Sequence, residues 1–271
     1  MRLEFTRSPD GRTFLARQHA AYPFHICRAL YTDDVPPGLA TVYTQSCSGG
    51  IFRGDCLRLA IECGEGSEAH VTTQASTIVH RTDAEPAEQE TTIRVRRGSH
   101  LEYRPDPTIL FPGAGLRSRL AVILAAEASV VLTESILCHS PAGNNGVFDH
   151  YAGEIRIIDE EGKLRALDRM AVRGSDFVRR RPGVTGRASC LGTLMLLALD
   201  RDPAPALAAL RQGLDAAADG VHAGASVLPG HCGVWCRIAA ADAVGLRRTL
   251  SDLWRICRAL RTGVPPAERR K

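Results

Sequence analysis

The most informative segment of this 271-residue chain reads Val71-Thr72-Thr73-Gln74-Ala75-Ser76-Thr77-Ile78-Val79-His80-Arg81. The segment is rich in β-branched residues, contains neither glycine nor proline, and follows Gly64, Gly66 and Ser67. These features predict an extended strand. In a single strand the even-numbered residues would share one side and the odd-numbered residues the other, so that each side carries both polar and apolar groups.

Two interpretations of this polar strand are open. It is either a solvated edge or surface strand, in which threonine occurs because it suits a pleated sheet, or a polar wall for a partner or a path. The neighbouring segments bear on the choice. Upstream, residues 44–55 join a strand to a glycine-rich turn and then to a second strand, Cys56 to Cys63. Downstream, residues 101–107 follow another short strand.

Four blocks occur in a fixed order along the first part of the chain. They are Tyr22-Pro23-Phe24 with Arg28, then Ser48-Gly49-Gly50-Ile51 with Gly54-Asp55, then Thr72-Thr73-Gln74-Ala75-Ser76-Thr77 with Arg81, and last Leu101-Glu102-Tyr103-Arg104-Pro105-Asp106-Pro107. Together they resemble the urease accessory proteins of the UreD/UreH family, over residues 22 to about 112. The resemblance weakens at residues 138–151, where the family usually carries a Gly-Arg pair and then a Gly-Glu pair. This chain keeps only Gly153-Glu154.

The resemblance implies a mainly β fold, with a multi-stranded stacked or helical β-sheet architecture and two α-helices near the C-terminus. It also implies a scaffold without catalytic activity, which joins apo-urease to a helical accessory protein of the UreF type and, through it, to a GTPase of the UreG type. The assembled complex would deliver nickel to the urease active site, where a lysine is carbamylated. Nickel would be bound only transiently, and no tightly bound cofactor is implied.

The resemblance also gives seven polar candidates for the nickel path or for partner binding: Asp55, Thr72, Gln74, Arg81, Glu102, Asp106 and Glu154. A nickel path needs polar or carboxylate groups that release the ion, because cages of histidine and cysteine would trap it. Structural roles compete at several positions. Asp55 can complete a turn after Gly54, Glu102 can pair with an arginine, and Arg81 can satisfy carbonyl groups at a strand end.

Composition narrows the class of protein. Hydrophobic residues make up 44% of the chain, enough for a substantial core, and 34 basic against 30 acidic residues give a net charge of +4. This small excess does not indicate a nucleic-acid-binding protein, for which charge would be clustered. The first residues contain no apolar core of signal-peptide length, and the longest apolar run, residues 190–199, is about half of a membrane span. A cytoplasmic protein is expected.

The nine cysteines are expected to be free thiols in such a protein. No Cys-x-x-Cys pair occurs, so no tight metal site is predicted. The nearest approaches are His25 with Cys27, Cys138 with His139, and His231-Cys232 with Cys236. Each is more typical of a buried cysteine beside a histidine than of a ligand set.

Short strands at spacings of roughly ten residues are predicted as far as about residue 200. The turn Ser8-Pro9-Asp10-Gly11 predicts a hairpin, and residues 57–62 alternate as in a sheet with one covered face. The C-terminal quarter predicts a helix from Asp202-Pro203 to Gly220, a hairpin within residues 226–238, and a helix from about 240 to 260. Arg247, Arg248, Arg255 and Arg258 largely occupy the polar face of this last helix. A single domain is expected over residues 1–262, with a disordered tail over 263–271.

Motifs of an active site are missing from the sequence. Gly49-Gly50 and Gly143 with Gly146 lack the spacing and the Lys-Ser/Thr pair of a phosphate loop, so GTP would have to bind elsewhere. No Gly-x-Ser-x-Gly elbow occurs. Besides the scaffold, two alternatives are open: a cysteine-dependent hydrolase, and a β-rich protein-interaction module unrelated to metal.

Overall fold

Two β-sheets dominate the computed structural model, which describes residues 1–143 and 146–267. Within these residues, the seven-stranded sheet A has the order β14 (Leu164–Arg173), β13 (His150–Asp159), β11 (Gly115–Leu124), β8 (Ala87–Val95), β5 (Cys56–Cys63), β1 (Arg2–Arg7) and β2 (Thr13–His19). The ten-stranded sheet B has the order β16 (Val221–Val227), β17 (Gly233–Ala240), β15 (Cys190–Leu197), β12 (Ser129–Cys138), β9 (His100–Arg104), β6 (Glu68–Thr73), β4 (Ala40–Ser46) and β3 (Phe24–Ile26), with β7 (Thr77–Val79) and β10 (Thr108–Leu110) beside this path.

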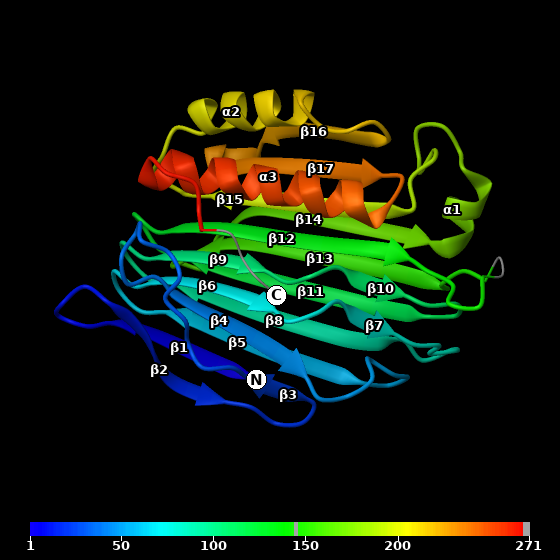
Figure 1. The fold of residues 1–271 in the computed structure, drawn as a ribbon, viewed down its shortest axis with the longest axis horizontal. Helices are drawn as coiled ribbons and strands as arrows, with labels where there is room; N and C mark the ends of the chain where they lie inside the picture. Colours follow the sequence, from blue (N-terminus) through cyan, green and yellow to red (C-terminus); the bar gives the residue numbers. More distant parts are fainter. Residues whose placement is uncertain (144–145, 268–271) are drawn as a thin grey trace.

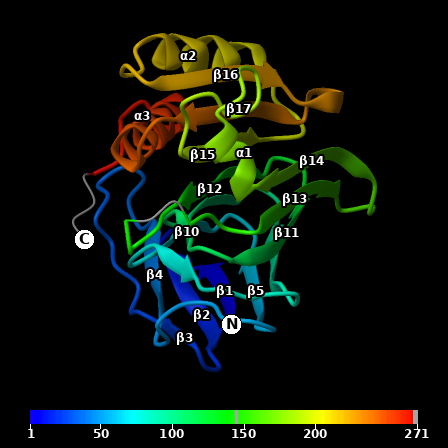
Figure 2. The ribbon, with the colours of Figure 1, turned by 90° about the vertical axis from the view of Figure 1, so that its right-hand side faces the viewer.

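The chain winds between the sheets as a coil, or β-solenoid. It passes from β4 to β5, then from β6 through β7 to β8, from β9 through β10 to β11, and from β12 to β13. Each coil pairs with the next in parallel in both sheets, as Figure 1 shows. Figure 2 views this stack along the strands, with the two sheets facing each other. The stacked and helical β architecture is therefore confirmed.

The register of the coils follows from the alternation of apolar residues. In sheet A, Ile61, Ile93, Val122 and Ile157 lie side by side on successive strands. In sheet B, Val42, Val71, Tyr103 and Leu132 do the same. All eight side chains are buried in one core between the sheets. A shift of one residue in any strand would turn its apolar side chains outward, so the pattern fixes the pairing.

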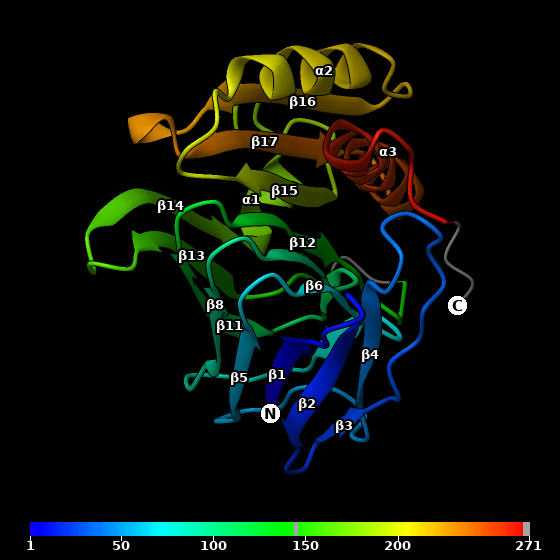
Figure 3. The same cartoon turned by 90° about the vertical axis from the view of Figure 1, so that its left-hand side faces the viewer.

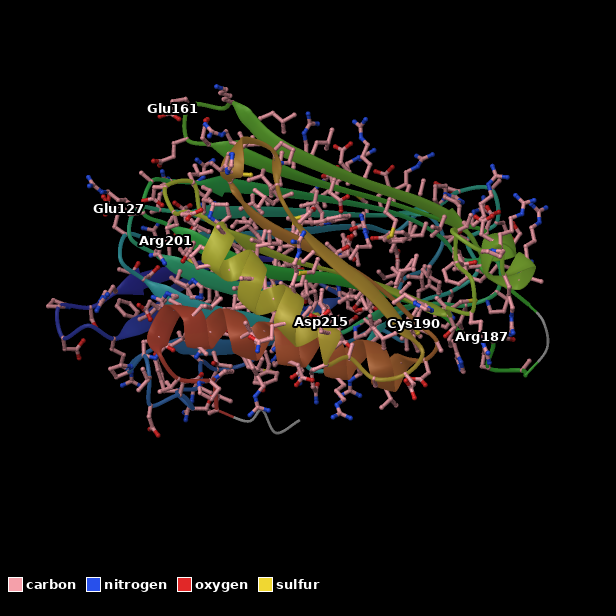
Figure 4. The ribbon with its side chains drawn as sticks, turned by 90° about the horizontal axis from the view of Figure 1, so that it is seen from above. Glu127, Glu161, Arg187, Cys190, Arg201 and Asp215 are labelled. Carbon is pink, nitrogen blue, oxygen red and sulfur yellow. The ribbon has the colours of Figure 1, made fainter. Side chains whose placement is uncertain are left out.

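The C-terminal part adds two helices to sheet B. Helix α2 (Ala204–Asp215) and helix α3 (Ala243–Thr262) enclose a second core with β15 and β17. Figure 3 shows α3 on the face of sheet B that points away from sheet A, and Figure 4 shows α2 and α3 side by side. Helix α3 begins at the N-cap Asp242, whose side chain accepts a hydrogen bond from the Gly245 amide, and it ends at Gly263, which adopts a positive φ.

Several boundaries differ from the sequence-based predictions. The polar segment 71–81 forms two strands, because the chain turns between β6 and β7 and the Gln74 amide donates to the Thr44 carbonyl at 2.9 Å. Helix α2 ends at Asp215 instead of Gly220, and α3 starts at Ala243 because β17 continues to Ala240. Helix α1 (Gly174–Arg179) and the 3₁₀ turn η1 (Pro229–His231) were not predicted.

The hairpins predicted near the two ends are present, as β1 with β2 and β16 with β17. Of the predicted tail, residues 268–271 lie outside the described residues. Among the described residues, no helix is long and apolar enough to cross a membrane.

Candidate functional site

A fully buried carboxylate, Glu102, lies between sheet B and α3. It projects from β9 beside His70 of β6, to which it is directly paired in register. Its Oε2 lies 2.6 Å from His70 Nδ1 and accepts hydrogen bonds from Trp254 Nε1 at 2.8 Å and Arg258 Nη2 at 2.7 Å. Its Oε1 accepts a hydrogen bond from Arg258 Nε at 2.6 Å. The carboxylate thus connects two strands of sheet B to α3.

Charge and burial oppose each other in this cluster. Burial alone would raise the pKa of Glu102, but the nearby His100 imidazole and hydrogen bonds from His70 and Arg258 hold the pKa well below its usual range. His100, whose Nε2 lies 3.6 Å from Glu102 Oε1, is also buried, and this burial lowers the pKa of its imidazole. Its Nδ1 lies 2.8 Å from Ser129 Oγ. The cluster therefore contains an ionised glutamate next to a histidine that folding keeps neutral.

Arg258 is fully buried, although its helical spacing placed it largely on the polar face of α3 in the sequence-based prediction. That prediction was wrong because Arg258 lies one helical turn after Trp254, and both residues face Glu102. The third guanidinium nitrogen, Nη1, lies 3.1 Å from Asp33 Oδ1, which also accepts a hydrogen bond from the Ala267 amide at 2.8 Å. One arginine thus joins sheet B, the loop before β4 and the segment after α3.

A groove of about 590 Å³ runs beside this cluster, between α3 and sheet B. Its walls include Thr72, Arg104, Asp106, Thr133 and Ser135 from the sheet side and Val244, Arg247, Arg248, Ser251 and Arg255 from α3. We call it the α3 groove. Its floor includes Trp254, and the guanidinium carbon of Arg104 lies 3.9 Å from the centroid of the Trp254 ring. The buried cluster therefore positions part of the groove through Trp254.

A second space lies between the two sheets. It has a volume of about 90 Å³ and is lined largely by hydroxyl-bearing and apolar side chains, with Asp106 and Glu134 as its carboxylates. Pro105, Asp106, Thr133 and Ser135 line both this interior cavity and the α3 groove. These four residues, just after β9 and in the middle of β12, therefore lie between the two spaces.

Glu134 is the acidic residue of the interior cavity that sequence reasoning missed. Burial raises the pKa of its carboxyl group, against hydrogen bonds from Tyr151 and Ser118 that lower it. The Ser118 hydroxyl donates to Glu134 Oε1 at 3.1 Å. Gly153 makes room for this pair, because a Cβ at that position would lie 2.9 Å from the Tyr151 hydroxyl oxygen and 3.2 Å from Glu134 Oε2. No motif around Glu134 marked it in the sequence.

The second, third and fourth blocks of the family resemblance lie along the side of the solenoid where the chain passes from sheet B to sheet A. Gly50 approaches β7 so closely that a Cβ would lie 2.5 Å from the Ile78 carbonyl oxygen, and its φ of 142° also favours glycine. Ile51 then bridges to Val79 in parallel. The fourth block contacts the third, because the Asp106 amide donates to Thr73 Oγ1 at 2.8 Å.

The structure brings three of the seven predicted site residues together. Thr72 and Asp106 line the α3 groove, and Glu102 is buried beside it. Thr72 is itself buried, and its hydroxyl donates to the Arg104 carbonyl at 2.6 Å. Gln74 lines a neighbouring pocket and forms a hydrogen bond with Gln45.

The other three predicted residues lie elsewhere. Asp55 accepts a hydrogen bond from the Phe52 amide at 2.8 Å, within the turn before β5. Arg81 is exposed and lies 3.6 Å from Asp83. Glu154 lies on β13 of sheet A, where Arg169 donates to it at 2.7 Å and Arg156 at 3.3 Å. Within the described residues, no group of three or more His, Cys, Asp or Glu side chains could hold a metal ion.

The fold and this site define a β-solenoid protein whose last described helix, α3, is fastened to one sheet through a buried ionic cluster. The chain belongs to the family of UreD urease accessory proteins, whose family model matches residues 1–271. Members of this family are non-catalytic factors in the maturation of urease and take part in the assembly of its nickel centre. The resemblance found in the sequence, and the expectation of a protein without enzymatic activity, are confirmed.

Individual relatives match nearly the whole chain. "Urease accessory protein UreD 1" of Pseudomonas syringae pv. syringae (strain B728a) is 40% identical over 269 residues, which cover 99% of this chain and 94% of that protein. "Urease accessory protein UreD 1" of Methylorubrum extorquens (strain PA1) is 39% identical, over 96% of this chain and 88% of the relative. The UreD protein of Natronomonas pharaonis is 33% identical, over 97% and 88%.

Proposed function

We propose that this chain is a scaffold in urease maturation that bridges apo-urease to a helical accessory protein of the UreF type and, through it, to a GTPase of the UreG type. In this role it helps to deliver nickel to the urease active site and acts in the cytoplasm. Membership in the UreD family supports the role in maturation. The finer proposal is supported by Asp106, which lines both the interior cavity and the α3 groove; we call this position the junction.

Nickel transfer requires ligands that bind the ion and then release it. Carboxylate and hydroxyl oxygens meet this requirement better than a closed set of histidines and thiolates, which holds nickel tightly. Asp106 and Glu134 lie along the cavity between the sheets, with Thr133 and Ser135 at the junction. We propose that nickel follows this lining, with Asp106 at the junction and Glu134 inside.

The remaining candidates take different parts in this proposal. Glu102 already accepts hydrogen bonds through both of its oxygens, so it acts by holding α3 against sheet B. Asp55 lies between β4 and β5, Gln74 follows β6, and Arg81 follows β7. We propose that these three residues contact a partner. Glu154 is proposed to do the same from the outer face of sheet A. Thr72 fixes the backbone of Arg104 in the wall of the groove.

The test is the nickel content and urea hydrolysis of urease purified from cells that express the complete urease gene set, with and without this chain. Both quantities should fall together when the chain is missing, while the urease subunits are still made. Fully active, nickel-loaded urease from cells without the chain would refute the maturation role. Loss of activity with a normal nickel content would refute the nickel path but not the scaffold.

A further inference from the structure

The α3 groove has a strongly cationic lining. Val244, Arg247, Arg248, Ser251 and Arg255 line it from α3 at spacings of three and four residues, so they form one face of the helix. Arg104 lines it from sheet B, and Asp106 is the one carboxylate among the described lining residues. Four guanidinium groups therefore face one aspartate across the same space.

The arginines on α3 have little charge compensation within the chain. Neither Arg247 nor Arg255 forms an ion pair with any residue in the described ranges, and both are exposed. Arg248 reaches Asp252 only at 4.0 Å, with both side chains more than half exposed. Exposed pairs of this kind contribute little to stability. These arginines are available for an external anion.

The groove is also preorganised. The guanidinium group of Arg104 stacks on the Trp254 ring, and Trp254 Nε1 donates to the buried Glu102. The Arg104 backbone is held by the Thr72 hydroxyl. A stacked guanidinium group loses little conformational freedom when it binds a carboxylate in a bidentate manner. The rest of the groove includes the exposed side chain of Val244, which offers apolar contact next to the charges.

We propose that the α3 groove binds an acidic, extended segment of a protein partner, whose aspartate or glutamate carboxylates pair with Arg247, Arg255 and Arg104. The distance from Val244 to Arg255 along the helix is about 16 Å, which matches roughly five residues of an extended peptide. Several carboxylates spaced along a chain fit this row better than one small anion does. The inference rests on the groove alone and holds whether or not nickel passes through the cavity.

The test is the binding of a fluorescein-labelled peptide of about ten residues, in which glutamate alternates with serine, to the full chain at low salt. The control peptide carries glutamine in place of each glutamate. The double variant R247E/R255E should bind the glutamate peptide about tenfold or more weakly than the original chain. The matched control is R179E/R181E, at and just after the end of α1, where both arginines are also exposed. It should bind as the original chain does.

Three outcomes would overturn the proposal. One is equal binding of the two peptides, and another is an equal loss in the control variant. The third is tighter binding of single-stranded DNA of similar charge through the same arginines, which would make the groove a phosphate site. Thermal unfolding of both double variants should match the original chain, because all four side chains are exposed. Peptide binding does not require urease, so a failed activation assay and a failed binding assay are distinguishable.

Discussion

Glu102 and Arg258 are 156 residues apart in sequence and form two hydrogen bonds, of 2.6 and 2.7 Å, in a fully buried site. The pair joins the third coil of the solenoid to the last helix of the chain. Other donors, including His70 and Trp254, complete the shell around the carboxylate. Single substitutions in and around this cluster test how much it contributes to stability.

Replacing Glu102 with glutamine should destabilise the protein by about 3–5 kcal/mol, because it leaves the Arg258 charge buried without its main partner. The free energy of unfolding in urea measures this loss. Glu127→Gln, which affects an exposed ion pair with Arg97, is the control and should leave the midpoint unchanged. A Glu102→Gln protein as stable as the original would show that the pair does not hold α3 to sheet B.

Stability should decrease as the pH falls below about 6.5, the ordinary pKa of histidine. Burial lowers the pKa of His100 in the folded state, so the unfolded chain takes up a proton that the folded chain refuses. Glu102 should add a second loss below about pH 4.3, because its pKa is depressed by folding. Urea midpoints at several pH values measure both effects. His100→Gln should reduce the loss of stability below pH 6.5. An unchanged dependence of the urea midpoint on pH would assign that loss to other groups.

Gly153→Ala should destabilise the protein by about 1–3 kcal/mol, because the new methyl group would collide with the Tyr151 hydroxyl near Glu134. Thermal unfolding measures the change. The second variant Tyr151→Phe removes that hydroxyl, so the double variant should recover part of the loss. If it recovers none, the collision lies elsewhere.

Asp106→Asn should lower both the nickel content and the activity of urease matured with this chain, since the amide keeps the shape of the side chain but loses its charge. Glu127→Gln is the comparison, at an exposed carboxylate that pairs with Arg97 and to which no role in the path is assigned. It should leave the nickel content of the purified urease near that of the original. Equal nickel loading with Asp106→Asn would exclude Asp106 from the path.

Cysteine alkylation should proceed first at Cys47 and Cys56, which are exposed. Burial raises the pKa of Cys63 and of Cys236 to about 12, so these thiols should react only after unfolding, as the thiolate is the nucleophile. Mass spectrometry after brief treatment with iodoacetamide gives the order of reaction. One cysteine that reacts far faster than Cys47 and Cys56 would favour the cysteine-dependent hydrolase.

The sequence was informative where a feature is local. Alternation over residues 57–62 predicted β5, and the Asp-Gly pair predicted the first hairpin. The apolar stripe of the last helix predicted its packing against the sheet. The sequence also allowed the structural role of Glu102, pairing with an arginine, to be named in advance, but it did not indicate which arginine.

The rest depends on contacts between distant segments. Glu134 and Tyr151 line the interior cavity from strands of opposite sheets, and the buried Arg258 finds its carboxylate partner on the outer face of β9. Neither relationship leaves a periodic trace in the chain. The division of residues 71–81 into β6 and β7 likewise reflects the corner of the coil, which tertiary pairing imposes on residues with high β propensity.

The position of α3 has a consequence for biosynthesis. The coils are made first and can pair with one another as they leave the ribosome, whereas α3 is made near the end and lies over strands from the first half of the chain. Until α3 arrives, His70 and Glu102 lack their partners from the helix, and the apolar side of β15 and β17 is covered by α2 alone. A nascent chain interrupted before residue 243 therefore carries a finished solenoid with an open flank, which makes it a substrate for chaperones or for aggregation.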